Sequence, residues 1–245
     1  MADKKVRACF DLILPAELNK VARRKAIAEN PANASPFEAA AVKSKLWKPG
    51  RTLSVHFLDG LEEVQKEVER YAREWERYAN IRFDFVNNPD AEIRISFNEE
   101  GSWSAIGTDA LVEEFFAKGT PTMNYGWLEP GLPASDYSSV VLHEFGHALG
   151  MIHEHQNPAN HIRWNKPEVY RSLSGPPNNW DQETIDHNMF ERYGATQTQF
   201  TAFDDKSIML YSFPSEWTLD GQSFPVNDQL SDRDKEFITA RYPKN

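Results

Sequence analysis

The chain has 245 residues, of which 40% are hydrophobic and 26% are charged, so it is long enough for one large globular domain or two closely packed lobes. Its 37 acidic and 27 basic residues give a formal net charge of -10, which argues against nucleic acid or an anionic membrane as the main partner. No apolar run reaches the length of a membrane span, and the single cysteine, Cys9, excludes an intramolecular disulfide.

Residues 1–49 are expected to form an N-terminal extension that precedes the main domain. They contain a short apolar patch around Cys9, a helix-prone segment over 16–29 and a loop-like stretch over 30–36. No apolar stretch long enough for a secretory signal precedes Pro15. The expected location is therefore the cytoplasm, or the outside of the cell by a route that needs no such signal.

The next hundred residues are expected to form a sheet backed by a helix. Alternating apolar residues predict strands over 51–58, 81–85 and 93–97. A long helix is predicted over 61–78, because its apolar residues recur every three or four positions opposite a charged face.

The stretch over 102–109 has a loop-like composition, and the stretch over 122–128 is predicted to be an edge strand. An edge strand has unpaired N–H and C=O groups, so an extended peptide can bind to it as an additional strand. The alternative is an ordinary interior strand. Further helices are predicted over 181–193 and over 231–242.

Three of the seven histidines lie between residues 140 and 154. His143 and His147 are four residues apart, so their imidazoles project from one face of a helix and can share a metal ion. Glu144 follows the first histidine on the same helix, where its carboxylate is placed to accept a proton as a general base.

Gly150 follows this helix at a point where helices commonly end with a residue of positive φ. The chain can therefore turn there and bring His153 to the same metal ion from another direction. Three neutral imidazoles leave one position of a tetrahedral zinc open, as catalytic zinc sites require. The alternatives are that His155 replaces His153 as the third ligand, or that the histidines are buried core residues without a metal.

The complete pattern His-Glu-x-x-His-x-x-Gly-x-x-His, followed by Glu154, resembles the metzincin zinc peptidases and the astacin branch in particular. The stretch 207–211, Ser-Ile-Met-Leu-Tyr, resembles the Met-turn of that clan. The resemblance implies that Met209 forms an apolar floor beneath the metal and that Tyr211 reaches the zinc or the oxyanion of the reaction. Considered without the resemblance, the apolar residues of 208–213 could be no more than a buried strand.

The resemblance also implies an α+β, metzincin-like fold. Its N-terminal lobe (50–150) would hold a twisted mixed sheet with a backing helix and the active-site helix. Its C-terminal lobe (151–245) would be irregular and mostly helical, and the substrate cleft would lie between the two lobes.

Many metzincins carry an N-terminal segment that inserts one residue into the fourth zinc position and keeps the enzyme latent. Cys9 is the first candidate for that residue because a thiolate is a good zinc ligand, and Asp11 is the second. The alternative is that Cys9 is a small buried residue that packs on the main domain.

These observations predict a zinc metalloendopeptidase whose Zn2+ ion is held by His143, His147 and His153, and in which Glu144 takes a proton from the attacking water. The expected partner is a protein or peptide bound in extended form, and the expected oligomeric state is a monomer. Two alternatives are a zinc-binding protein without general protease activity and an effector or toxin peptidase with a single target.

Overall fold

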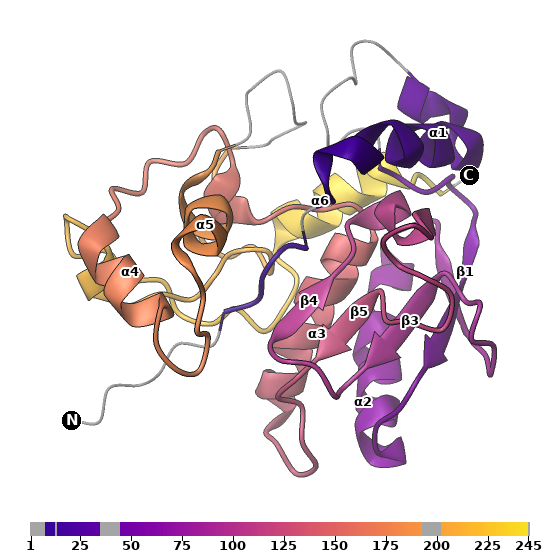
Figure 1. The fold of residues 1–245 in the computed structure, drawn as a ribbon, viewed down its shortest axis with the longest axis horizontal. Helices are drawn as coiled ribbons and strands as arrows, with labels where there is room; N and C mark the ends of the chain where they lie inside the picture. The colour runs from indigo at the N-terminus through magenta and orange to yellow at the C-terminus, as the bar shows by residue number, and fades with distance from the viewer. Residues whose placement is uncertain (1–7, 13, 35–44, 193–201, 245) are drawn as a thin grey trace.

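A computed structural model of the chain describes residues 8–12, 14–34, 45–192 and 202–244 (Figure 1). These residues form an α+β structure with a sheet-containing lobe and a second lobe that has little regular secondary structure. Among the described helices, none combines the length and the apolar character that a membrane crossing requires.

Five strands form one mixed sheet in the order β2-β1-β3-β5-β4. The strands are β1 (Thr52–Phe57), β2 (Arg82–Phe85), β3 (Ile93–Ser96), β4 (Ser102–Ser104) and β5 (Met123–Tyr125). The first, second, third and fifth strands run parallel, and β4 pairs antiparallel with β5. The strands predicted from alternating apolar residues are confirmed, because side chains such as Leu53, Val55 and Ile95 are fully buried.

The edge strand differs from the sequence-based prediction. Residues 123–125 lie inside the sheet as β5, whereas the edge next to the second lobe is β4, which falls in the stretch predicted to be a loop. β4 has only three residues, Ser-Trp-Ser, and all three are buried. So short a strand shows no alternation of apolar and polar residues, and its pairing with β5 defines it.

Two helices pack against the sheet and against each other (Figure 1). α2 (Glu62–Ala72) is shorter than the predicted helix over 61–78, and a 3₁₀ turn, η4 (Trp75–Arg77), continues it. This turn keeps the Trp75 side chain in the core, where its indole N–H donates to the carbonyl oxygen of Leu142 at 3.1 Å. Leu142 belongs to α3 (Ala134–Ala148), the helix that carries the first two histidines of the cluster.

The second lobe contains short helices joined by irregular segments. They are η6 (Glu154–Gln156), α4 (Lys166–Leu173), α5 (Gln182–Ile185), the π-helical turn η7 (Asp186–Phe190), η8 (Ser215–Trp217) and α6 (Asp232–Arg241). The helix predicted over 181–193 is divided between α5 and η7, and its last residue lies outside the described part of the chain. The C-terminal helix agrees with the prediction, including a capping box in which Ser231 and Asp234 bond each other's backbone N–H groups.

The N-terminal residues lie against both lobes. η1 (Ala16–Leu18), α1 (Asn19–Glu29) and η2 (Pro31–Ala34) lead along the sheet lobe, where α1 packs on the 3₁₀ turn η5 (Gly107–Leu111). The segment 8–12, which is indigo in Figure 1, runs between the two lobes. Its Phe10 N–H donates to the Ser102 carbonyl oxygen of β4 at 3.2 Å, and its Asp11 N–H donates to the Asn188 Oδ1 of the second lobe at 2.7 Å.

Candidate metal centre and active site

His143 and His147 lie on the last two turns of α3, and both side chains are buried. Gly146, between them, is the point at which another segment approaches the helix, because a Cβ atom there would collide with the sulfur of Met209. Any larger residue there would force the Met209 side chain to move away from the helix. The need for a glycine at this position was not anticipated from the sequence, since the zinc motif does not specify that residue.

The chain turns back after α3 as the sequence predicts. Gly150 has a φ of +90°, and the Met151 N–H donates to the Gly146 carbonyl oxygen at 2.9 Å, which closes the end of the helix. His153 then follows in an extended conformation and is fully buried. The turn thus returns His153 toward the imidazoles of α3.

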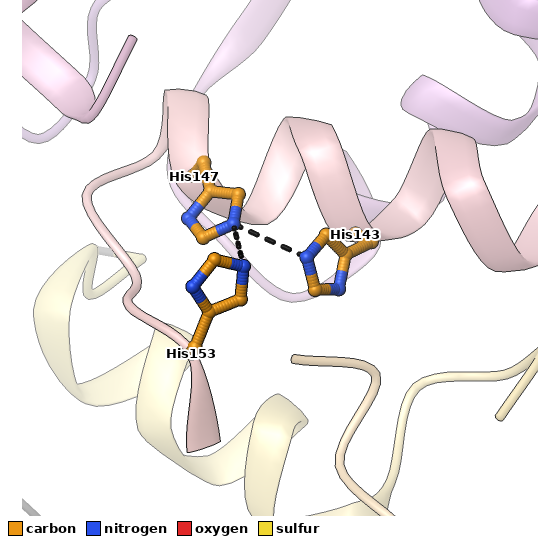
Figure 2. Close-up of side chains that lie close together, drawn as sticks. All are labelled: His143, His147 and His153. Carbon is orange, nitrogen blue, oxygen red and sulfur yellow. Dashed lines mark hydrogen bonds between the residues drawn. The ribbon is translucent and has the colours of Figure 1, made fainter. Parts of the chain in front are cut away.

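The three imidazoles converge through their Nε2 atoms (Figure 2). The Nε2 of His147 is 3.2 Å from that of His143 and 3.1 Å from that of His153. A tetrahedral zinc ion bound at about 2.0–2.1 Å would separate two imidazole nitrogens by about 3.3–3.4 Å. The three side chains therefore fit a zinc ion after shifts of a few tenths of an ångström.

The outer nitrogens of the imidazoles contact acceptors that orient the rings. The Nδ1 of His143 lies 2.8 Å from the Ile208 carbonyl oxygen, and the Nδ1 of His147 lies 3.0 Å from the Met151 carbonyl oxygen. A proton on each Nδ1 leaves the Nε2 lone pair free for a metal. Burial and the neighbouring imidazoles lower the pKa of His143 well below its usual value and that of His147 to about 4, so both are neutral near pH 7.

Glu144 lies beside this cluster with no exposed surface. Neither of its carboxylate oxygens accepts a hydrogen bond from the described residues. Burial raises the pKa of Glu144 well above its usual value; the neighbouring Cys9 thiol opposes this rise, and the nearby carboxylate of Asp11 adds to it. A buried carboxylate with a raised pKa is a stronger base than an exposed one, which suits proton transfer.

Met209 and Tyr211 lie next to the histidines, on the segment that resembles a Met-turn. Met209 is buried against Gly146 of α3. The ring centroid of Tyr211 is 4.2 Å from that of His153 and 5.9 Å from that of His143. The Tyr211 hydroxyl donates a hydrogen bond to the Cys9 carbonyl oxygen. The phenol therefore already binds a carbonyl oxygen at this site.

Cys9 and Asp11 reach different sides of the cluster. The Cys9 sulfur, a nitrogen of His143 and a carboxylate oxygen of Glu144 all lie within 4.8 Å of one another. The Asp11 carboxylate is 3.2 Å from the Nδ1 of His153 and 3.8 Å from the Nε2 of His147, at ion-pair distance but without the alignment of a hydrogen bond. Burial would raise the pKa of Asp11, but these two histidines lower it below its usual range.

The other histidines lie away from the converging Nε2 atoms. His155 is buried next to the Tyr211 ring, and its Nε2 is 2.6 Å from the Asn188 carbonyl oxygen, so it does not take the place of His153. His187 contacts the Glu191 carboxylate at 2.6 Å, and His161 is exposed. His56 lies on β1, with its Nδ1 3.1 Å from the Val86 carbonyl oxygen.

The mixed sheet, the convergence of three imidazoles across a glycine turn and the adjacent buried glutamate together define a zinc peptidase of the metzincin class. A sequence model of the Astacin peptidase family matches residues 39–218. This chain belongs to the astacin family of zinc peptidases, whose members hydrolyse peptide bonds.

Individual relatives agree with this assignment. The chain is similar to the zinc metalloproteinase nas-23 of Caenorhabditis elegans, with 25% identity over 185 residues that cover 76% of this chain and 30% of that protein. It therefore spans less than a third of that relative. A solved structure of myroilysin has 43% sequence identity and a TM-score of 0.78, covering 83% of this chain and 98% of that one.

A more distant structure shares the fold. High choriolytic enzyme 1, a hatching enzyme zinc-protease from Oryzias latipes, superimposes with a TM-score of 0.56 at 20% identity, covering 82% of this chain and 96% of that one. The metzincin-like α+β fold expected from the sequence is confirmed.

Proposed function

We propose that this protein is a zinc-dependent endopeptidase that cleaves proteins or peptides bound in extended form. The main support is the convergence of His143, His147 and His153 beside Glu144, at the point where a segment of the chain itself passes between the two lobes. A polypeptide segment therefore fits this site, and a substrate would occupy the same path.

His143, His147 and His153 would hold the zinc ion through their Nε2 atoms. When bound, zinc polarises a carbonyl group and lowers the pKa of water toward neutrality. Met209, buried against Gly146 between the two α3 histidines, would keep that side of the site apolar.

Glu144 would accept a proton from the attacking water and transfer it to the nitrogen of the departing amine. Its position next to the first ligand and its complete burial support this role, because the proton transfer would then occur in a region of low dielectric. Tyr211 would donate its hydroxyl hydrogen to the carbonyl oxygen of the substrate as negative charge develops there. The bond from this hydroxyl to the Cys9 carbonyl oxygen supports that role.

The edge strand β4 would hold the substrate backbone. The contact of Phe10 supports this proposal, because its N–H donates to the Ser102 carbonyl oxygen at 3.2 Å. Backbone hydrogen bonds of this kind bind an extended peptide largely independently of its side chains. This mode of binding suits an endopeptidase that accepts varied sequences.

The segment 8–12 would keep the enzyme latent, as part of an N-terminal extension (1–49) that precedes the two catalytic lobes (50–150 and 151–245). Cys9 lies beside His143 and Glu144, and its carbonyl oxygen accepts the hydrogen bond of the Tyr211 hydroxyl. Cys9 therefore blocks the groups proposed for proton transfer and oxyanion binding. Asp11 contacts the other two histidines. We assign the main inhibitory contact to Cys9.

Glu144→Gln tests the proposed function, introduced into a full-length Cys9→Ala chain so that latency does not hide activity. The Cys9→Ala parent should cleave casein, and a zinc chelator should abolish the cleavage. Glu144→Gln should reduce kcat by about 10²- to 10⁴-fold, the usual contribution of general base catalysis, while one zinc per chain is retained. Glu62→Gln is the matched control because the Glu62 side chain is 80% exposed on α2. Equal cleavage by both variants would refute the assignment of Glu144.

Cys9→Ala and Asp11→Ala, each in the otherwise unchanged chain, test latency. Cys9→Ala should raise the initial rate of casein cleavage well above that of the parent, and Asp11→Ala should raise it less. A parent chain that is already as active as Cys9→Ala would refute latency without affecting the peptidase assignment. A larger rise for Asp11→Ala would transfer the inhibitory role to that carboxylate.

A further inference from the structure

The segment 207–211 is fixed by a carboxylate from α6. The Asp234 Oδ2 accepts a hydrogen bond from the Ile208 N–H at 2.8 Å, and its Oδ1 accepts one from the Ser207 hydroxyl at 2.7 Å. The same carboxylate accepts the Ser231 N–H at 2.9 Å as part of the capping box of α6. Asp234 thus joins the beginning of the last helix to the segment below the histidines.

These hydrogen bonds continue to His143. The Met209 N–H donates to the Ser207 Oγ at 3.1 Å, and the Ser207 hydroxyl in turn donates to Asp234. Met209 N–H and the Ile208 carbonyl belong to the same peptide unit, and that carbonyl oxygen lies 2.8 Å from the Nδ1 of His143. A continuous chain of hydrogen bonds therefore runs from a carboxylate, through a hydroxyl and a peptide group, to an imidazole of the metal centre.

The position of the Ile208 carbonyl is not determined by the helix that carries His143. For His147, the acceptor is the Met151 carbonyl oxygen, only four residues along the chain. For His143, the acceptor is 65 residues away, in a segment without regular secondary structure. Asp234 fixes both peptide groups that flank Ile208, one directly and one through Ser207.

A carboxylate suits this role better than an apolar side chain. Asp234, Ser207 and Ile208 are each no more than 3% exposed, so water does not compete for their hydrogen bonds. In such an environment, consecutive hydrogen bonds polarise one another, and a negative charge at one end makes the carbonyl at the other end a better acceptor. A stronger acceptor at Nδ1 favours the tautomer of His143 that binds metal through Nε2 and makes that nitrogen more basic.

We propose that Asp234 is a positioning residue for the metal ligand His143 and that it acts through Ser207 and the Ile208–Met209 peptide group. The proposal depends on the proposed function only in requiring that the histidine cluster binds zinc. Asp234 contacts neither the metal nor the substrate, and it raises the affinity of the site for zinc by orienting one imidazole.

The experiment compares zinc binding by the full chain with binding by Asp234→Ala and Asp234→Asn. Asp232→Ala is the matched control, because Asp232 lies in the same first turn of α6 with a side chain that is 95% exposed. Asp234→Ala should raise the zinc dissociation constant about 10- to 100-fold, as is typical when a partner of a metal ligand is removed. Asp234→Asn keeps acceptors for the Ile208 and Ser231 N–H groups and should produce a smaller rise, whereas Asp232→Ala should leave the constant within about twofold.

Two further readouts separate positioning from general destabilisation. The absorption spectrum of the cobalt-substituted protein should change in Asp234→Ala and not in Asp232→Ala, because only the first alters the orientation of a ligand. Urea unfolding and circular dichroism of the zinc-free proteins identify the range of urea concentrations in which each variant is folded. Zinc binding is compared within that range.

Ser207→Ala covers the case in which Asp234→Ala does not fold. It removes the bridge between the Met209 N–H and Asp234 but leaves the bonds that Asp234 accepts from the Ile208 and Ser231 N–H groups, so zinc affinity should fall about fivefold, less than in Asp234→Ala. Zinc affinities and cobalt spectra of Ser207→Ala and Asp234→Asn that equal those of Asp232→Ala would overturn the proposal. Normal zinc binding in the Cys9→Ala chain without any peptidase activity would refute the proposed function and leave this inference standing.

Discussion

In the sheet-containing lobe, the helix that carries His143 and His147 rests on apolar side chains that repeat along strands and helices, whereas the lobe after Gly150 combines an apolar core with buried polar side chains that bond to the backbone. Val55, Ile95 and Phe145 represent the first kind of packing, and all three are fully buried. Asn160 and Asn188 represent the polar contacts, since each is 1% exposed and its side-chain oxygen accepts a hydrogen bond from a backbone N–H, that of Ile162 and that of Asp11 respectively. The side of the site formed by the sheet lobe is thus stabilised mainly by area buried from water, and the side formed by the second lobe adds satisfied hydrogen bonds to such buried area.

This difference explains how the two lobes can be unlike and still bring His143, His147 and His153 together. Apolar packing is non-directional, so it makes a rigid support but places individual atoms only indirectly. Hydrogen bonds have preferred lengths and angles, so they fix particular peptide groups, such as the Ile208 carbonyl beside His143. The two lobes should therefore respond differently to substitution.

Phe83→Ala should produce the largest loss of stability. Phe83 on β2 is 3% exposed and packs edge-to-face on Phe145 of α3, with ring centroids 5.0 Å apart. Removing this ring should lower the free energy of unfolding by about 3–5 kcal/mol, measured by urea denaturation. Phe115→Ala removes the same group from a residue that is 36% exposed and should cost much less. Equal losses for the two variants would contradict a support based on buried apolar area.

Asn160→Ala tests the buried polar contacts of the lobe after Gly150 and should lower stability less than Phe83→Ala. The Asn160 amide donates to the His155 carbonyl oxygen and accepts the Ile162 N–H at 2.6 Å. Truncation leaves both backbone groups buried without these partners, which should lower the free energy of unfolding by about 1–3 kcal/mol. Asn87→Ala, at an exposed turn position, is the control. If the two asparagine variants unfold at the same urea concentration, the polar support of this lobe is wrongly assigned.

Glu92→Gln should have the smallest effect, and its size should depend on pH. Burial opposes ionisation of Glu92, but hydrogen bonds from Ser54 and the charge of Arg51 lower its pKa below the usual value. Because the folded-state pKa is lower than the unfolded one, the carboxylate contributes stability above the unfolded value and loses it as pH falls through the folded value.

The difference in unfolding free energy between the parent and Glu92→Gln should be about 1 kcal/mol at pH 7 and should shrink as the pH falls below about 4. Urea denaturation at a series of pH values measures this difference. A difference that grows on acidification would mean that the pKa of Glu92 is raised instead. This polar contact lies in the sheet lobe. If Glu92→Gln lowers the free energy of unfolding more than Asn160→Ala does, buried polar contacts are not more important in the second lobe than in the sheet lobe.

The features that the sequence predicts well have a short-range physical cause. The histidine spacing on α3 follows from the helical repeat, and the turn at Gly150 follows from its positive φ. The strands with alternating apolar residues follow from the twofold repeat of a half-buried strand. The capping box of α6 is likewise visible from Ser231 and Asp234 alone.

The features that the sequence does not predict depend on contacts between distant residues. β4 is a strand because it pairs with β5, not because of its three residues. The bonds from Asp234 to Ser207 and Ile208 join segments more than 20 residues apart, and no periodic pattern marks them. The path of residues 8–12 through the site is of the same kind, although Cys9 and Asp11 could be named as candidates from their chemistry.

The central claim is that His143, His147 and His153 together bind one zinc ion. X-ray absorption spectroscopy at the zinc edge, combined with metal analysis, tests it most directly on the full chain and on His153→Ala. We expect about one zinc per chain with three imidazole ligands in the parent, and a much weaker site with one imidazole fewer in the variant. A parent chain that binds no zinc, or whose zinc environment is unchanged by His153→Ala, would contradict the account.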